Sequence, residues 1–258
     1  MILIDKSTIQ TIPFLHLVRE EDMNIPLPTC FFIHGFTSAK EHNLHYAYLL
    51  AEKGFRVILP DCLEHGERSS GKSEYQLGEV FWKIVLNTIH ELSILKEHFE
   101  EKGLITPNGI GVAGTSMGGI VTLGALTQYE WISSAVSLMG NPTYVKFAQA
   151  QLAQVESSLG YDLPFSEGEI ESMMSELAHY DLSLQPEKLG GRPLMFWHGK
   201  RDKVVPFHLT REFYDSILPY YEEREDHLLF IEDDKADHKV TREGVLRLVE
   251  WFEKHLSA

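Results

Sequence analysis

The sequence predicts an α/β fold: a mostly parallel, doubly wound sheet of the eight-stranded type with one helical insertion. Three observations carry this prediction. Short apolar runs alternate along the chain with longer segments of helical period. One of these runs leads directly into a helix through a glycine-rich turn. The stretch 141–190 breaks the alternation, because it contains helical signals only.

The length and composition suit a single domain that spans residues 1–258. A chain of 258 residues can bury a large core, and 43% hydrophobic with 24% charged residues is typical of globular proteins. The formal net charge of -15 argues against nucleic acid and anionic membranes as partners, since phosphate binding requires clustered Lys and Arg. These features leave the oligomeric state open.

The amino terminus and the cysteines indicate the compartment. One short apolar patch ends at Asp5 and has no basic flank before it, unlike a secretory signal peptide. No later stretch approaches the roughly 18 apolar residues that a membrane helix needs. Cys30 and Cys62 are too few for a disulfide framework and are expected to be free, buried thiols. We therefore expect a cytoplasmic protein.

The predicted strands are apolar runs bounded by turn residues. The first eighteen residues predict an antiparallel ribbon formed by Ile2–Ile4 and Ile12–Val18. Later runs end at glycine or proline, or pass directly into a helix, as buried strands of a parallel sheet do. These later runs are Thr29–Ile33, Phe55–Leu59, Ile110–Gly114, Ala135–Met139, Pro193–Trp197 and Leu228–Ile231.

The predicted helices show apolar residues at helical spacing. One is expected over 40–53, with Gly54 placed to end it, and a long one over 75–101, ended by Gly103. A third begins after Ser116. The chain closes on an amphipathic helix whose apolar face consists of Val245, Leu248, Val249, Phe252 and Leu256.

The stretch 141–190 is too long for a simple connection between a helix and a strand. Gly160, Pro164 and Gly168 are expected to break its helices. We interpret it as a cap or lid over the carboxyl end of the sheet, where open α/β folds bind ligands. The alternative is a pair of packing helices with no role in substrate choice.

The segment Gly114-Thr115-Ser116-Met117-Gly118 is the strongest chemical signal in the sequence. The pattern Gly-x-Ser-x-Gly describes a strand that turns abruptly into a helix, with the serine at the apex. Glycine is needed on both sides because larger side chains would collide where helix and strand approach. Ser116 is therefore the candidate nucleophile.

A serine hydroxyl needs a neighbouring base, and His238 is the candidate. In this kind of fold the order along the chain is serine, acid, histidine. His238 follows the last predicted strand after a loop, so it lies at the same edge of the sheet as Ser116. His227 opens that strand instead, which puts it at the wrong end of the sheet.

The imidazole needs an acid that fixes its tautomer, and Asp202 is preferred. Asp202 lies in the loop after the strand Pro193–Trp197, beside the expected position of the His238 loop. Asp233, Asp234 and Asp237 are closer to His238 in sequence, but a chain neighbour is rarely placed to reach the far ring nitrogen. They are expected to form a solvated acidic loop.

The oxyanion of an acyl-transfer reaction needs two preorganised donors. The backbone N–H of Met117, directly after the nucleophile, is one candidate. The Phe36 N–H in the turn His34-Gly35-Phe36-Thr37 is the other. His34 is expected to order this turn by hydrogen bonding.

Other polar clusters predict no cofactor and no metal. Glu41, His42 and His45 have helical spacing but lack a third histidine or cysteine ligand, so a solvated helix face is expected. His65 and Arg68 follow a strand near the candidate site, where they either contact substrate or anchor the loop. No glycine-rich dinucleotide or phosphate loop is found.

Together, these motifs resemble the α/β-hydrolase superfamily, and more narrowly small bacterial esterases of the prolyl-oligopeptidase and dienelactone-hydrolase-like branch. The resemblance runs from about residue 12 to residue 256. It implies a Ser116, Asp202 and His238 triad, an oxyanion hole at Phe36 and Met117, and carboxylesterase activity on short acyl esters. The blocks that carry it are His34-Gly35-Phe36, Gly114 to Gly119, Trp197 to Asp202 and Asp237-His238.

The expected function is therefore that of a serine carboxylesterase acting on a small-molecule ester through an acyl-enzyme on Ser116. An acyltransferase or a thioesterase using the same triad is the alternative, distinguished by its acceptor or its leaving group. A non-catalytic binding module is a second alternative, although such modules normally lack a triad member.

Overall fold

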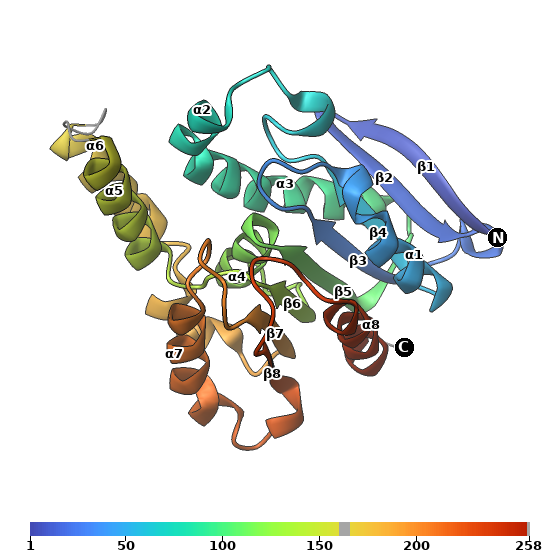
Figure 1. The fold of residues 1–258 in the computed structure, drawn as a ribbon. Helices are drawn as coiled ribbons and strands as arrows, with labels where there is room; N and C mark the ends of the chain where they lie inside the picture. Colours follow the sequence, from blue (N-terminus) through green and yellow to red (C-terminus); the bar gives the residue numbers. More distant parts are fainter. Residues whose placement is uncertain (160–165, 257–258) are drawn as a thin grey trace.

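The computed structural model describes residues 1–159 and 166–256. Within these ranges, eight strands form one sheet in the order β1-β2-β4-β3-β5-β6-β7-β8 (Figure 1). The pairs β1–β2 and β2–β4 are antiparallel, and every other pair is parallel. The strands are β1 (Ile2–Ile9), β2 (Ile12–Arg19), β3 (Leu27–Ile33), β4 (Arg56–Pro60), β5 (Ile105–Thr115), β6 (Ser134–Leu138), β7 (Leu194–Gly199) and β8 (Leu228–Asp233). The predicted mostly parallel, doubly wound sheet is confirmed.

Eight α-helices occur in the same described ranges. They are α1 (Leu44–Glu52), α2 (Glu74–Glu79), α3 (Phe81–Glu101), α4 (Met117–Gln128), α5 (Tyr144–Leu159), α6 (Glu167–Ala178), α7 (Phe207–Ile217) and α8 (Arg242–Leu256). Short 3₁₀ turns connect several of them. The predicted amino-terminal ribbon is also present, since β1 and β2 pair from Ile2 opposite Arg19 to Ile9 opposite Ile12.

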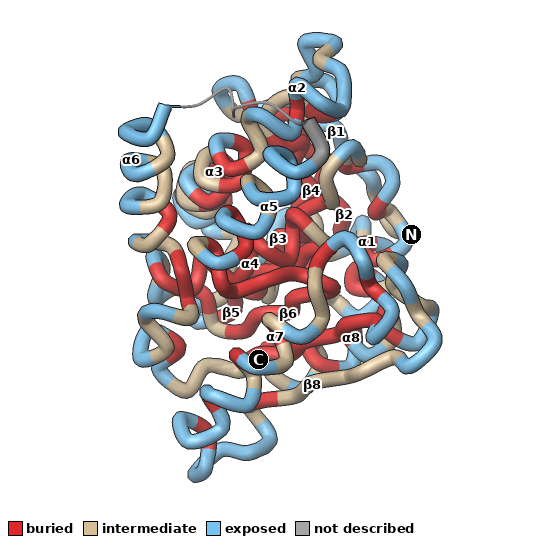
Figure 2. The backbone as a smooth tube through the Cα atoms, turned by 60° about the vertical axis from the view of Figure 1, so that its left-hand side comes forward, coloured by how far each residue is buried: buried red, intermediate tan, exposed pale blue. Residues whose placement is uncertain are grey.

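The central strands, from β2 to β7, are buried on both faces of the sheet, whereas the edge strand β1 consists of half-buried and exposed residues. Successive side chains of a strand point to opposite sides. In β3, Phe31 and Ile33 pack with α3 and α4, whereas Cys30 and Phe32 pack with α1 and α8. Figure 2 shows the result as buried strands surrounded by helices whose outer sides are exposed. Each fully buried large apolar side chain contributes roughly 1.5–3 kcal/mol, so these two clusters hold the fold together.

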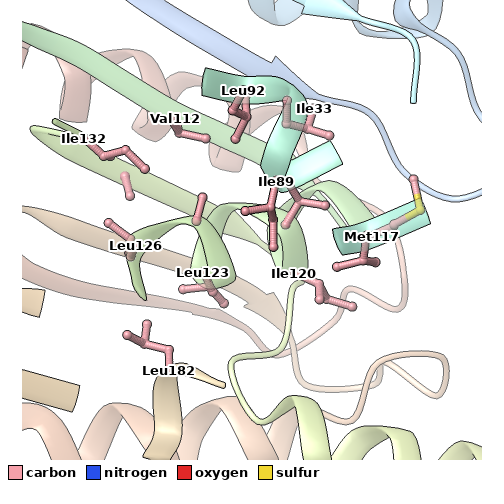
Figure 3. Close-up of a cluster of buried hydrophobic side chains, with 14 of the residues drawn as sticks. Ile33, Ile89, Leu92, Val112, Met117, Ile120, Leu123, Leu126, Ile132 and Leu182 are labelled. Carbon is pink, nitrogen blue, oxygen red and sulfur yellow. The ribbon is translucent and has the colours of Figure 1, made fainter. Parts of the chain in front are cut away.

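The core between α3, α4 and the sheet reaches the candidate site. Met117 and Ile120, at the start of α4, lie in the same buried cluster as Ile89 of α3 and Ile33 of β3 (Figure 3). Met117 is completely buried. The residue after Ser116 is therefore anchored by its side chain in the core.

The predicted helix over 75–101 is two helices, and this prediction was wrong at its start. Ser73 and Gln76 form a reciprocal capping box that begins α2. Val80 then leaves helical geometry, with φ -110° and ψ 12°, before α3 begins at Phe81. Gly78, two residues earlier, has low helix propensity and weakens the continuous pattern.

The helix predicted over 40–53 begins late. Residues Lys40–Asn43 form a 3₁₀ turn instead, because Lys40 is drawn into a buried ion pair. Its Nζ lies 2.6 Å from Asp61 Oδ2, and its backbone N–H donates to Asp61 Oδ1 at 3.0 Å. Asp61 belongs to the loop after β4, so a long-range contact decides the local structure.

Helix α7 was not predicted. Its buried residues Thr210, Phe213 and Ile217 do have helical spacing, and Pro206 stands directly before its first residue. The signal was available in the sequence but lies between two strong strand signals. The helix packs on β7 and β8, where Phe213 contacts Phe196 with ring centroids 6.2 Å apart.

Between β6 and β7 the described residues contain helices and no strand. Helices α5 and α6 project beyond the carboxyl end of the sheet, at the left of Figure 1. Two short 3₁₀ turns, Leu182–Leu184 and Pro186–Leu189, lead back to β7. Gly168 lies inside α6 near its start rather than at a break, and Gly160 and Pro164 lie outside the described residues.

Candidate active site

Ser116 stands at the turn between β5 and α4. Its φ of 53° and ψ of -116° are rare for a residue with a side chain, and such strain persists only where the surroundings impose it. The Ser116 N–H donates to the Leu138 carbonyl of β6 at 2.8 Å, and its carbonyl accepts from Ile120 N–H at 2.9 Å. The hydroxyl is thereby held at the apex of the turn.

The glycines on both sides of Ser116 are required by the close approach of helix and strand. A methyl group on Gly114 would lie 2.7 Å from the Cα of Gly118. A methyl group on Gly118 would overlap the Ile33 carbonyl and lie 2.6 Å from its carbon. Both obstacles are backbone atoms, which cannot rotate away.

Replacing Gly118 with alanine should therefore destabilise the protein by about 3 kcal/mol or more, at the upper end of the usual cost of overpacking. Urea unfolding followed by circular dichroism measures the change. Gly168→Ala in α6 is the matched control, since a methyl group there meets no atom within 4 Å. An equal urea midpoint for the two variants would contradict the steric argument.

Ser116, His238 and Asp202 form one continuous chain of hydrogen bonds. His238 lies in the loop between β8 and α8, and its Nε2 is 2.8 Å from Ser116 Oγ. Its Nδ1 is 2.7 Å from Asp202 Oδ2. The structure thus brings together three residues that lie far apart in the sequence.

Asp202 is held as a carboxylate. Oδ1 accepts the N–H groups of Val204 at 2.8 Å and Val205 at 2.9 Å. Burial opposes the charge, but hydrogen bonds from His198, His238 and the Val205 N–H hold the pKa of Asp202 well below its usual range. An ionised carboxylate only accepts, so Nδ1 of His238 carries the proton and Nε2 accepts from the Ser116 hydroxyl.

His198 is a site residue that the sequence reasoning missed. It is fully buried at the end of β7, with Nε2 3.0 Å from the Val205 carbonyl and 3.3 Å from Asp202 Oδ2. A proton on Nε2 serves both oxygens, so His198 supports the same carboxylate oxygen, Oδ2, that His238 contacts. The one available signal was its position four residues before Asp202 in the block Trp197-His198-Gly199.

The rejected candidates lie elsewhere. His227 is at the amino end of β8 and contacts the Gly191 carbonyl through Nδ1 at 3.0 Å. Asp233 Oδ1 accepts two N–H groups of its own loop, and Asp234 pairs with Lys200 at 2.8 Å. Asp233 and Asp234 are thus engaged in loop structure.

Phe36 and Met117 both lie near Ser116, Met117 as the next residue in the chain and Phe36 in the same cavity wall. Phe36 follows Gly35 in the turn after β3, where a methyl group on Gly35 would lie 3.6 Å from Ser116 Cβ. Thr37 closes the turn with a φ of 59°. Neither the Phe36 N–H nor the Met117 N–H has an acceptor among the described residues. Both amides are therefore available to a bound group.

A cavity of about 490 Å³ opens beside Ser116. Phe36, Ile120 and Trp82 belong to its walls, and α5 contributes Phe147. Trp82 Nε1 donates to Gln151 Oε1 at 3.0 Å, which ties α3 to α5 at the cavity wall. The lining is largely apolar, as in most sites for small molecules. The remaining lining residues are Tyr75, Gly78, Glu79, Phe81, Ala148, Gln151, Leu152, Gln154, Val155, Met173, Val204 and Val205.

Two further findings concern the described residues as a whole. Over residues 1–159 and 166–256, His, Cys, Asp and Glu nowhere gather in a group of three or more that suits a metal ion. Within the same ranges no helix combines the length and apolar character that crossing a bilayer requires. Cys30 and Cys62 are both free and buried.

Comparisons with known proteins show the family to which the chain belongs. A model of the prolyl oligopeptidase family matches residues 41–258. The Bacillus subtilis (strain 168) protein named "Putative esterase YitV" is 55% identical over 256 residues, covering 99% of this chain and 100% of that protein. "Esterase YjfP" of Escherichia coli (strain K12) is 29% identical over 257 residues, covering 99% and 100%.

Among solved structures, TT1662 from Thermus thermophilus has a TM-score of 0.75 at 23% identity, covering 100% of this chain and 99% of that one. Fold and family match together define the class: this is an enzyme, a serine hydrolase with the α/β-hydrolase fold. Within that class, the chain belongs to the prolyl oligopeptidase family. The resemblance identified from the sequence is confirmed.

Proposed function

We propose that this enzyme is a carboxylesterase that hydrolyses small, short-acyl carboxylic esters through an acyl-enzyme on Ser116. The observation that carries the proposal is the unbroken hydrogen-bond chain from Ser116 Oγ through His238 to Asp202, at 2.8 and 2.7 Å. These distances lie within the reach that proton transfer requires. The names of the two relatives both contain the word esterase, which supports the reaction class.

In this mechanism, His238 Nε2 takes the proton as Ser116 Oγ attacks the ester carbonyl. The N–H groups of Phe36 and Met117 stabilise the negative charge that develops on the carbonyl oxygen by donating hydrogen bonds to it. His238 then gives the proton to the departing alcohol, which leaves an ester on Ser116. A water molecule attacks that ester with the same proton relay, releasing the acid and restoring the serine.

The cavity supports a small and largely apolar substrate. Its volume of about 490 Å³ falls within the usual range for small-molecule sites, so one small ester fits with both its acyl and its alcohol parts. Helices α5 and α6 supply part of the wall. We assign the insertion 141–190 the role of a cap that closes this side of the site.

A series of p-nitrophenyl esters from acetyl to dodecanoyl tests the substrate class. The expected result is the highest kcat/KM among the short acyl chains and a decline for chains longer than the cavity accommodates. A kcat/KM that rises continuously to dodecanoyl would contradict the short-acyl assignment. A matched p-nitroanilide serves as the control for peptidase activity, and faster cleavage of it would overturn the ester preference.

Two additions to the same assay test the alternatives. A thioester cleaved in preference to its oxygen ester would indicate a thioesterase. An added alcohol that diverts the acyl group from water would indicate an acyltransferase. If no substrate turns over, a fluorophosphonate probe is applied, and failure to label Ser116 would favour a binding protein.

A further inference from the structure

Two loops meet at the carboxyl edge of the sheet, one after β3 and one after β4. The first contains His34 and Phe36, and the second contains His65. Each loop supplies a histidine that accepts a backbone N–H of the other. His34 Nε2 accepts from Cys62 N–H at 3.0 Å, and His65 Nε2 accepts from Thr37 N–H at 3.0 Å.

The second nitrogen of each ring completes the arrangement. His34 Nδ1 lies 2.8 Å from the Gly35 carbonyl, and His65 Nδ1 lies 2.8 Å from the Leu63 carbonyl. A carbonyl only accepts, so Nδ1 carries the proton in both rings and Nε2 is the acceptor. Both side chains are buried, and their ring centroids are 5.1 Å apart. We call this reciprocal pair, His34 and His65, the histidine clasp.

The clasp acts on the turn that contains the Phe36 amide. The Thr37 N–H held by His65 directly follows Phe36 in the chain. The Phe36 ring also rests edge-on against the His65 ring, with centroids 5.6 Å apart. A shift of this turn would move the Phe36 N–H relative to Ser116, and oxyanion donors work only when correctly placed.

We propose that the histidine clasp positions the Phe36 amide for the oxyanion, and that protonation of His65 opens the clasp. His65 is then a positioning residue, not a catalytic one. The proposal rests on the esterase function proposed above. A proton on His65 Nε2 would point at the Thr37 N–H, which turns a hydrogen bond into a contact between two donors.

The surroundings keep both rings neutral until the solution is acidic. Burial lowers the pKa of His34 to about 4 and also lowers the pKa of His65. The charges that face His65 are the carboxylates of Asp61 and Glu64, which oppose this shift. The two carboxylates raise the pKa of His65 only to a limited extent, because each is already in an ion pair, Asp61 with Lys40 and Glu64 with Lys72.

His34 has further titratable neighbours. His65 and His42 face it and lower its pKa, whereas Asp61 and the hydrogen bond to the Gly35 carbonyl raise it. Its second loop contact is the uncharged Cys62 amide. Protonation therefore opens the clasp only at acidic pH, at the His65 side or at both sides.

Two substitutions separate hydrogen bonding from packing at His65. His65→Gln places an amide oxygen near the position of Nε2, so it accepts the Thr37 N–H and cannot be protonated. His65→Phe fills the same space but accepts nothing. We expect kcat to fall roughly 10- to 100-fold for the phenylalanine variant, because losing an oxyanion donor entirely costs about 10²–10³-fold. KM should change less than about twofold, because the alignment matters chiefly in the transition state.

The pH profile gives a readout that packing alone would not move. The ratio of kcat for His65→Gln to kcat for the wild type should rise as pH falls from 7 to 4.5. Titration of other groups cancels in this ratio. Equal losses for both variants at every pH, or wild-type kcat in His65→Phe, would overturn the clasp. If His65→Phe does not fold, the pH ratio of His65→Gln alone decides, and a flat ratio refutes the proposal.

Two companions make the failures distinguishable. His90→Gln, at an exposed position on α3, is the matched control and should behave like the wild type. The rate of fluorophosphonate labelling at Ser116 is measured beside ester turnover, since phosphonylation uses the same oxyanion donors. A Ser116→Ala variant as active as the wild type would refute the esterase mechanism. A dead Ser116→Ala variant with an unaffected His65→Phe would refute the clasp alone.

Discussion

Ser116→Ala should lower kcat for ester hydrolysis by about 10⁵-fold or more, since loss of a serine nucleophile elsewhere costs about 10⁶-fold. Only the hydroxyl is lost, so the backbone strain at residue 116 and its hydrogen bond to Leu138 remain. Urea unfolding should therefore show little change in stability. The loss is confined to chemistry because His238 Nε2 no longer has a hydroxyl to deprotonate.

The measurement is turnover of p-nitrophenyl butyrate together with labelling by a fluorophosphonate probe. Ser69→Ala serves as the control, because Ser69 is an exposed loop residue whose hydroxyl accepts the Gly71 N–H. The control should keep wild-type activity and full labelling. Residual turnover above one part in a hundred in Ser116→Ala, from a sample free of contaminating esterase, would contradict the assignment of the nucleophile.

The parts of the site that the sequence predicts are those encoded by local pattern and chain order. The glycines around Ser116 signal the sharp turn, because the backbone at the start of α4 packs directly against the ends of β5 and β3, where a larger side chain would collide. His238 and Asp202 were located from the strands that precede them, since parallel strands deliver their following loops to one edge. That logic also explains the rejection of His227, which stands before its strand and not after it.

The parts that escape prediction depend on contacts between distant segments. His198 supports Asp202 only because the loop after β7 folds back on the strand end. The clasp needs β3 and β4 as neighbours and joins residues 28 positions apart. The 3₁₀ turn at Lys40 follows from an ion pair with a distant loop, which periodicity does not report.

The residues of the candidate site and of the histidine clasp all lie at the carboxyl edge of the sheet. The loops after β3, β4, β5, β7 and β8 all meet there, and each loop makes a hydrogen bond at this edge, several of which are buried. Lys40 and Asp61 fix the β4 loop, and Asp202 caps its own loop through two N–H groups. A buried polar group is costly when unpaired, so these contacts make the geometry of the edge rigid as well as stable.

Asp202→Asn should lower kcat by about 10⁴-fold while the protein stays folded, as loss of the triad acid does in serine proteases. The amide oxygen can take the place of Oδ1, which accepts the N–H groups of Val204 and Val205. The amide nitrogen then replaces Oδ2 and faces His238 Nδ1. Because an amide NH₂ donates, Nδ1 must accept, and the proton moves to Nε2. His238 in that tautomer cannot take the proton of Ser116.

The matched control is Asp234→Asn, which removes an exposed acid from the His238 loop where it pairs with Lys200. Both variants lose one negative charge at the same edge of the sheet, so a general electrostatic effect would slow them equally. The tautomer argument instead requires Asp202→Asn to lose four orders of magnitude in ester turnover and Asp234→Asn to stay within about twofold of the wild type. Comparable losses of activity in both variants would mean that Asp202 acts through its charge alone. The hydrogen bond from His238 to Asp202 would then not explain the reactivity of Ser116.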